Sequence, residues 1–141
     1  MKRQFTYLVL AVLIFAGCTT LHSIPLEERS RLVNAPYDAT FRAAMEALVE
    51  AGYGIASTDK DVGLIVTEYA ITDPPFRMRS NIMLAQENGG QTRVTLRFDY
   101  NYVTTEGQVV EAPLRTERAK RLYKQGLDSI ESRALSYAES Q

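Results

Sequence analysis

The chain has 141 residues, of which 45% are hydrophobic and 23% are charged, and its formal net charge is −1. This length and composition are typical of one globular domain with a single core. The charge excludes the strongly basic composition of a nucleic-acid-binding protein, so we expect no nucleic-acid partner.

The first seventeen residues have the layout of an export signal. A positively charged start precedes an apolar run over residues 7–16 and the small residue Gly17. The run is shorter than the roughly 20 apolar residues that a membrane-spanning helix needs. Phe15-Ala16-Gly17-Cys18 resembles the bacterial lipobox, which implies cleavage before a lipid-modified cysteine. The sequence therefore predicts a lipoprotein signal peptide over residues 1–17 and lipid attachment at Cys18.

Two further observations concern this anchor. Cys18 is the only cysteine in the chain, so it has no partner for an internal disulfide. Thr19 follows it, and the resemblance implies that only an aspartate there would retain the protein at the inner membrane. Because two or more acyl chains hold a protein on a membrane almost permanently, we expect a lipid-anchored protein on the periplasmic face of the outer membrane. The alternative is an uncleaved N-terminus with Cys18 as an ordinary buried thiol.

A tether is expected between the anchor and the domain. Residues 18–29 include Pro25 and show no hydrophobic periodicity. A single periplasmic domain is then expected over residues 30–141. It opens with a short edge strand around Leu32 and Val33.

The next predicted element is a helix between Pro36 and Gly52. Proline suits the first turn of a helix, and glycine commonly ends one. Apolar residues recur between them at helical spacing, at Tyr37, Phe41, Ala44, Met45 and Leu48. We interpret this stripe as a core face, and the alternative is a partner-binding face.

Two strands are predicted after this helix, over residues 53–58 and 64–71, with a charged turn over residues 59–63. Asp59 and Asp61 in the turn are candidate calcium ligands. The stretch lacks the further oxygen ligands of a calcium loop and places a lysine between the two carboxylates. No metal site is therefore expected here.

Residues 77–102 predict a β-hairpin. Apolar residues occupy even-numbered positions on both sides of a glycine-rich turn. If both sets face one core, the register requires a three-residue loop, with Leu84 beside Val94. The same register places Arg79 opposite Asp99 on the other face.

A long final helix is predicted to begin at Pro113. Its inward positions are Ala119, Tyr123, Gly126, Leu127, Ile130, Ala134 and Tyr137. Its first half is basic, with Arg115, Arg118, Lys120, Arg121 and Lys124. These cations form either a solvated face or a surface that attracts anionic headgroups or an acidic partner.

Together these elements predict an α+β fold, with a mostly antiparallel sheet of about four to five strands and two helices packed on one face. The only histidine, His22, lies in the expected tether, and the only cysteine is expected to carry lipid. Histidine-dependent nucleophilic catalysis and a histidine zinc site are therefore not expected. We expect no enzyme activity, no cofactor and no metal.

The predicted register also gathers arginines on the sheet face that turns away from the helices. These are Arg77, Arg79, Arg93 and Arg97, and only Asp99 clearly opposes their charge. Arginine clusters bind carboxylates or phosphates through paired hydrogen bonds. We therefore predict a partner-binding surface for an acidic envelope protein or anionic lipid headgroups. The alternative is a face that is simply solvated.

One stretch carries a family resemblance. Gly52-Tyr53-Gly54-Ile55, followed by Asp59-Lys60-Asp61-Val62-Gly63-Leu64-Ile65-Val66-Thr67, resembles the domains of small outer-membrane lipoproteins of the BamC (NlpB) type, over roughly residues 30–72. The resemblance implies a helix-grip-like α+β sandwich that serves as a non-catalytic binding or scaffold module in envelope assembly or maintenance. The alternative function is a carrier that holds a lipid-like small molecule between the sheet and the C-terminal helix.

Overall fold

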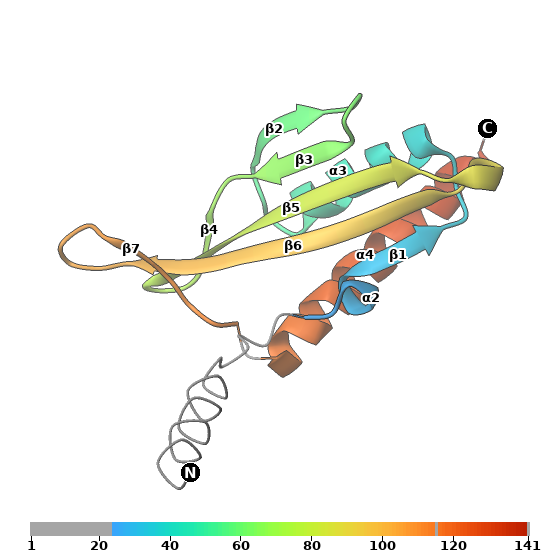
Figure 1. Cartoon of the computed structure of the whole chain (residues 1–141). Coiled ribbons are helices and arrows are strands. Elements are labelled where there is room, and N and C mark those ends of the chain that lie inside the picture. Colours follow the sequence, from blue (N-terminus) through green and yellow to red (C-terminus); the bar gives the residue numbers. More distant parts are fainter. Residues whose placement is uncertain (1–23, 115, 141) are drawn as a thin grey trace, which may run out of the picture.

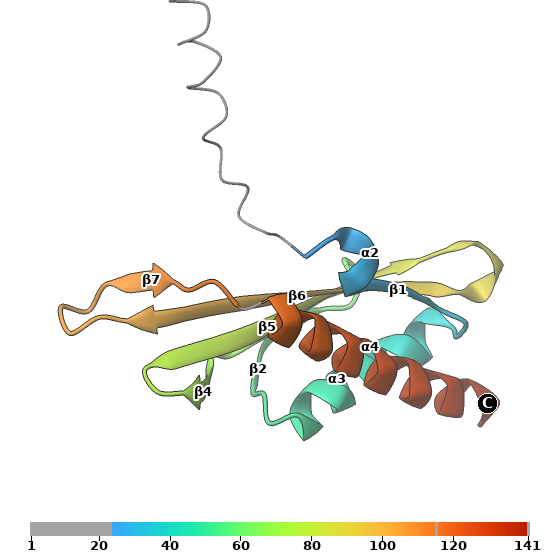
Figure 2. The ribbon, with the colours of Figure 1, turned by 90° about the horizontal axis from the view of Figure 1, so that it is seen from below.

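Two long helices lie on one side of an antiparallel sheet in the computed structural model, which describes residues 24–114 and 116–140 (Figures 1 and 2). The helices are α2 (Leu26–Arg29), α3 (Tyr37–Glu50) and α4 (Thr116–Glu139). The strands are β1 (Ser30–Val33), β2 (Ile55–Asp59), β3 (Leu64–Thr67), β4 (Ala70–Asp73), β5 (Phe76–Gln86), β6 (Thr92–Val103) and β7 (Val109–Glu111). The expected signal peptide, Cys18, Thr19, His22 and Arg115 lie outside the described residues.

The sheet confirms the predicted α+β class. Its strands follow the order β1-β6-β5-β3-β2, with β4 also paired to β5 and β7 also paired to β6. The sheet therefore has seven strands instead of the four to five expected, because β4 and β7 extend it. Both are short, and neither was predicted as a separate strand.

The central hairpin has the predicted register. Leu84 pairs with Val94, and Arg79 pairs with Asp99. Residues 87–91 join β5 to β6, and the backbone N–H of Glu87 donates to the carbonyl of Gln91 at 2.8 Å, which encloses a three-residue turn, Asn88–Gly90, with positive φ angles at Gly89 and Gly90. The open end of the hairpin, where β4 and β7 join it, extends past the helices (Figures 1 and 2).

The prediction of one continuous strand over residues 64–71 is wrong, because the structure has two strands there, β3 and β4. The first part, β3, pairs with residues 81–83 of β5, whereas β4 pairs nearer the open end of the hairpin. Between them, the backbone N–H of Glu68 donates to the carbonyl of Gly54 at 2.8 Å. The chain therefore separates from β5 after β3 and pairs with it again at β4. The continuous apolar sequence gives no sign of this break.

The N-terminal part of the domain also differs from expectation. Residues 26–29, placed in the tether by the sequence, form the helix α2, and Glu28 forms an ion pair with Lys120 of α4 at 3.3 Å. Strand β1 lies at the sheet edge as predicted. Its Arg31 reaches α4 and pairs with Asp128 at 2.6 Å and Glu131 at 2.8 Å.

The helix α3 begins directly after Pro36 and ends two residues before Gly52, which has a φ of 87°. The predicted apolar stripe lies toward the core. Ala44 and Leu48 are buried, whereas its larger members Tyr37, Phe41 and Met45 are half-buried at the margin of the core. The core interpretation of this stripe is therefore confirmed.

The helix α4 begins at Thr116, three residues after the proline that was expected to open it. Five of its predicted inward residues are buried, namely Ala119, Tyr123, Leu127, Ile130 and Ala134. They pack against even-numbered residues of the hairpin, including Leu84, Val94 and Leu96. Within the described ranges, no helix has the length and apolar character needed to cross a membrane.

Candidate functional site

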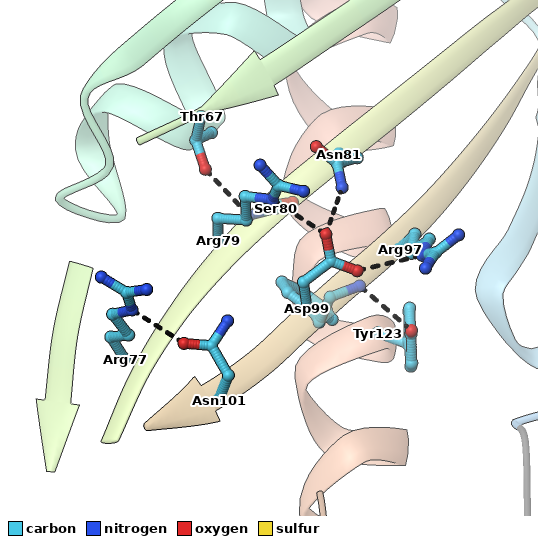
Figure 3. Close-up of polar contacts among 10 residues, drawn as sticks. Thr67, Arg77, Arg79, Ser80, Asn81, Arg97, Asp99, Asn101 and Tyr123 are labelled. Atoms are coloured by element: carbon cyan, nitrogen blue, oxygen red, sulfur yellow. Dashed lines mark hydrogen bonds and ion pairs between the residues drawn. The ribbon is translucent and has the colours of Figure 1, made fainter. Parts of the chain in front are cut away.

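The candidate site is the open face of the sheet, by which we mean the face carrying the odd-numbered residues of β5 and β6, opposite α3 and α4. The structure places all four predicted arginines there, since each occupies an odd-numbered position in the register of β5 and β6. Arg77 and Arg79 lie on β5, and Arg93 and Arg97 lie on β6. Figure 3 shows three of them around Asp99 and Asn101.

Asp99 is the centre of this arrangement. Its carboxylate accepts hydrogen bonds from Nε of Arg79 at 2.8 Å, Nε of Arg97 at 3.0 Å and the amide of Asn81 at 3.0 Å. Its side chain is only 17% exposed. Burial acts to raise the pKa of Asp99, but the hydrogen bonds from Arg79, Asn81 and Arg97 and the charge of Arg97 outweigh it and hold the pKa below its usual value.

The other two arginines have partners of their own. Nε of Arg77 donates to the Oδ1 of Asn101 at 2.7 Å, and Asn101 is buried beneath it. The guanidinium groups of Arg77 and Arg79 both lie over the ring of Tyr69, at 4.5 and 4.9 Å from its centre. Nε of Arg93 donates to Glu87 at 2.8 Å.

All four arginines are therefore held in the same way, through Nε. A guanidinium has two terminal amino groups besides Nε, and these form the fork that binds a carboxylate or phosphate through two parallel hydrogen bonds. The side chains of Arg93 and Arg97 are 47% and 68% exposed. The inner bonds fix these groups in position while their forks stay accessible to an outside anion.

The charge of the open face is smaller than predicted. Only Asp99 was expected to oppose the arginines, but Glu87 bonds to Arg93, and β7 places Glu111 opposite Asn101 on the same face. By register Asp59 also belongs to this face, so the carboxylates balance most of the charge of the four guanidinium groups. The sequence did not indicate Glu111 because β7 itself was not predicted.

Exposed apolar side chains surround the arginines, a feature that the sequence reasoning missed. They are Leu32, Ile71, Met83, Val103 and Val109. Each belongs to the open face by register, since Leu32 opposes Arg93 and Ile71 opposes Arg77, for example. Single exposed apolar residues are ordinary, but several on one face indicate a contact surface. The predicted hairpin register already implied the exposure of Met83.

A pocket of about 300 Å³ opens beside Asp99. Its polar lining comes from Tyr69, Arg79, Arg97, Asp99, Asn101 and Glu111. Two guanidinium groups and two carboxylates therefore line this pocket, so its charges are balanced. Nearby on β6, the hydroxyl of Tyr123 from α4 accepts the backbone N–H of Phe98 at 3.3 Å (Figure 3).

The acidic turn considered as a calcium candidate has a structural role. The side chain of Asp59 accepts the backbone N–H groups of Asp61 at 3.1 Å and Val62 at 3.0 Å, which fixes the turn between β2 and β3. In the described part of the chain, no three or more histidine, cysteine or acidic side chains are grouped so as to hold a metal ion.

No protein-family model matches this chain, and no curated protein matches it. The open face is therefore interpreted from its own residues.

Proposed function

We propose that this protein is a lipid-anchored periplasmic lipoprotein of the outer membrane that acts as a non-catalytic docking module in envelope assembly or maintenance. Its open face binds carboxylates on an acidic envelope protein. One observation carries the proposal, namely four arginines held through Nε on one face, of which Arg93 and Arg97 have side chains 47% and 68% exposed. Such preorganisation lowers the entropic cost of binding an anion.

The apolar residues favour a protein partner over lipid headgroups. Headgroup binding requires only cations near the surface. Protein interfaces, in contrast, are enriched in arginine and methionine and have an apolar interior. The open face combines arginines with exposed apolar side chains such as Met83, which is 53% exposed. Met83 pairs across the strands with Thr95, whose hydroxyl hydrogen-bonds to that of Ser30.

The sequence supports the membrane anchor and the cellular location. The export signal, the lipobox-like motif and the single cysteine all agree with lipid attachment at Cys18. Eight residues from Cys18 to Pro25 span at most about 28 Å when fully extended, so the domain works close to its membrane. The likeness of residues 30–72 to BamC-type domains supports a role in envelope assembly.

Site-specific photo-crosslinking in living cells tests the docking proposal. A photoreactive residue at Met83 on the open face should give a discrete protein adduct. The same residue at Val49, which is 60% exposed on α3, is the matched control and should give none. Adducts to lipid instead of protein would assign the face to membrane headgroups.

Charge reversal then tests whether the arginines carry the interaction. Arg93→Glu together with Arg97→Glu should abolish the Met83 adduct. Each reversal removes an ion pair, with Glu87 or Asp99, and brings two carboxylates together, so some stability is lost and thermal melting must show that the variant remains folded. Arg121→Glu with Lys124→Glu on α4 makes the same change of charge elsewhere and should leave the adduct intact. An adduct that survives the open-face reversal would refute the proposed role of the arginines.

A further inference from the structure

On the opposite side of the sheet, a cleft of about 280 Å³ lies between α3, α4 and the hairpin. Its lining is mainly apolar and includes Leu48, Tyr53, Leu96, Phe98, Gly126 and Ile130. Ala47 of α3 and Ala51, which follows its last residue, also line it, and their small side chains leave this space unfilled. Polar groups, including Glu50 and Gln125, lie at its rim.

Two residues of the cleft lining lower local stability. Ser80 interrupts a row of buried apolar side chains on β5, between Met78 and Ile82. Gly126 lies inside α4, where a glycine costs about 1 kcal/mol relative to alanine. A Cβ at this position would lie 2.9 Å from Cδ1 of Leu96, so the glycine allows the Leu96 side chain to approach α4 closely at the wall of the cleft.

The hydroxyl of Ser80 is the decisive group. Ser80 is 0% exposed and lines the cleft, and its Oγ has no hydrogen-bond partner among the described residues. The buried hydroxyls of Thr40 and Thr92 both donate to backbone carbonyls, and that of Thr67 accepts the backbone N–H of Ser80 at 2.8 Å (Figure 3). An unpaired buried hydroxyl costs roughly 1–3 kcal/mol, so Ser80 has bonding capacity that a ligand can use.

We propose that this cleft binds a compact, mainly apolar molecule, about the size of one substituted aromatic ring, whose single hydroxyl or carbonyl group hydrogen-bonds to Ser80. The size follows from comparison with known cavities. An apolar cavity of about 150 Å³ holds benzene, and sites for larger drug-like ligands begin near 300 Å³. The cleft therefore fits a ring with substituents, and it is too small for a phospholipid with two acyl chains.

The polar rim completes the match to such a ligand. Arg133 of α4 forms an ion pair with Glu50 at the end of α3, and it also bonds to Ser129 of the cleft lining at 3.5 Å. These groups remain in contact with solvent at the mouth. The ligand thus meets a polar group at its buried end, apolar walls around its ring and solvent at its outer end.

This site makes the carrier hypothesis more specific, because it limits the ligand to a small molecule of this kind. The cleft is separate from the open face, so either proposal can fail without the other.

Binding of para-cresol and toluene to the full-length protein tests the proposal, because the two probes differ by one hydroxyl group. In NMR titrations, para-cresol should shift the backbone amide signals of Ser80, Gly126 and Ile130 in a saturable way. Toluene should bind at least about tenfold more weakly, because it leaves the Ser80 hydroxyl unpaired. The absence of a saturable shift with both probes would overturn the proposal and leave Ser80 with solvent water as its partner.

Two variants assign the effect to the cleft. Ser80→Ala should bind both probes equally, whereas Ser132→Ala, at an exposed serine of α4, should keep the preference for para-cresol. Gly126→Leu should fill the cleft and abolish binding of both probes. Gly126→Ala adds only a methyl group and increases the helix propensity of α4, so it replaces the leucine variant in this test if that variant does not fold. A preference for para-cresol that persists in Ser80→Ala would refute the assignment of Ser80.

Discussion

Asp99 shows how a single carboxylate organises the open face. It holds Arg79 and Arg97 on neighbouring strands and also accepts a hydrogen bond from Asn81. The sequence predicted the pair of Arg79 with Asp99, because the register follows from the alternation of apolar residues. It did not predict the contribution of Asn81 or the bond between Arg77 and Asn101, since alternation assigns a residue to a face and does not specify its side-chain contacts.

The lowered pKa of Asp99 predicts a pH-dependent stability. Because the folded pKa is below the unfolded value of about 3.9, ionised Asp99 stabilises the fold above that pH and loses this effect as pH falls through the folded value. Asp99→Asn should lower the free energy of unfolding by about 1–3 kcal/mol at pH 7. The difference from the unaltered protein should shrink below about pH 4, as measured by urea unfolding between pH 7 and pH 3.

Glu139→Gln serves as the control for this experiment, because it neutralises an exposed carboxylate at the end of α4. It should change the free energy of unfolding by less than about 0.5 kcal/mol. A difference between Asp99→Asn and the unaltered protein that stays constant from pH 7 to pH 3 would contradict the role assigned to the Asp99 charge.

At the scale of elements, the long hairpin and both long helices were predictable, and the short strands were not. The hairpin and the helices are long enough for their hydrophobic periodicity to be read. The strands β4 and β7 have only four and three residues and therefore show no period. Since β7 supplies Glu111 and Val109 and β4 supplies Ile71, part of the open face that the sequence missed is carried by these short strands.

The turn between β2 and β3 depends on Gly63. This residue has a φ of 81°, and the backbone N–H of Leu84 donates to its carbonyl at 2.7 Å. A Cβ here would lie 2.0 Å from the carbonyl oxygen of Leu84, which is a backbone atom that cannot move aside without disturbing β5. Gly63→Ala should therefore lower the free energy of unfolding by about 3 kcal/mol or more, measured by urea unfolding.

Gly52→Ala is the matched control for this turn. Gly52 has a similar φ of 87°, but a Cβ there would meet no atom within 4 Å. Its substitution should cost only the backbone strain of a left-handed alanine, about 1–2 kcal/mol. Equal losses for the two variants would show that the close approach to Leu84 contributes nothing.

At the scale of the whole molecule, the proposed membrane anchor is Cys18. Cys18→Ala should abolish labelling by radioactive palmitate and move the protein from the membrane fraction to the soluble fraction of lysed cells. Both effects follow from the loss of the only thiol that can carry lipid. Thr19→Ala leaves that thiol in place and should preserve labelling. Palmitate incorporation in the Cys18→Ala protein would disprove the assignment.

The overall arrangement of the domain was predicted in class and order, with both long helices on one face of an antiparallel sheet. The packing between the helices was not predictable from their periodicity. A helical pattern identified Gly126 as an inward position, but only the structure shows that Leu96 closely approaches it at the wall of a cleft. The same holds for Ser80. Its even position on β5 places it in the core, but does not indicate that its hydroxyl has no partner among the described residues.

The position of β1 bears on the order in which the chain can fold. Its Ser30 bonds to Thr95, which is 65 residues away, and its Arg31 bonds to Asp128, which is 97 residues away. Synthesis begins at the N-terminus, so β1 emerges first and then waits for the hairpin and the last helix. The hairpin, which pairs neighbouring segments, can form long before this edge closes. The edge formed by β1 is therefore complete only after α4 has been made.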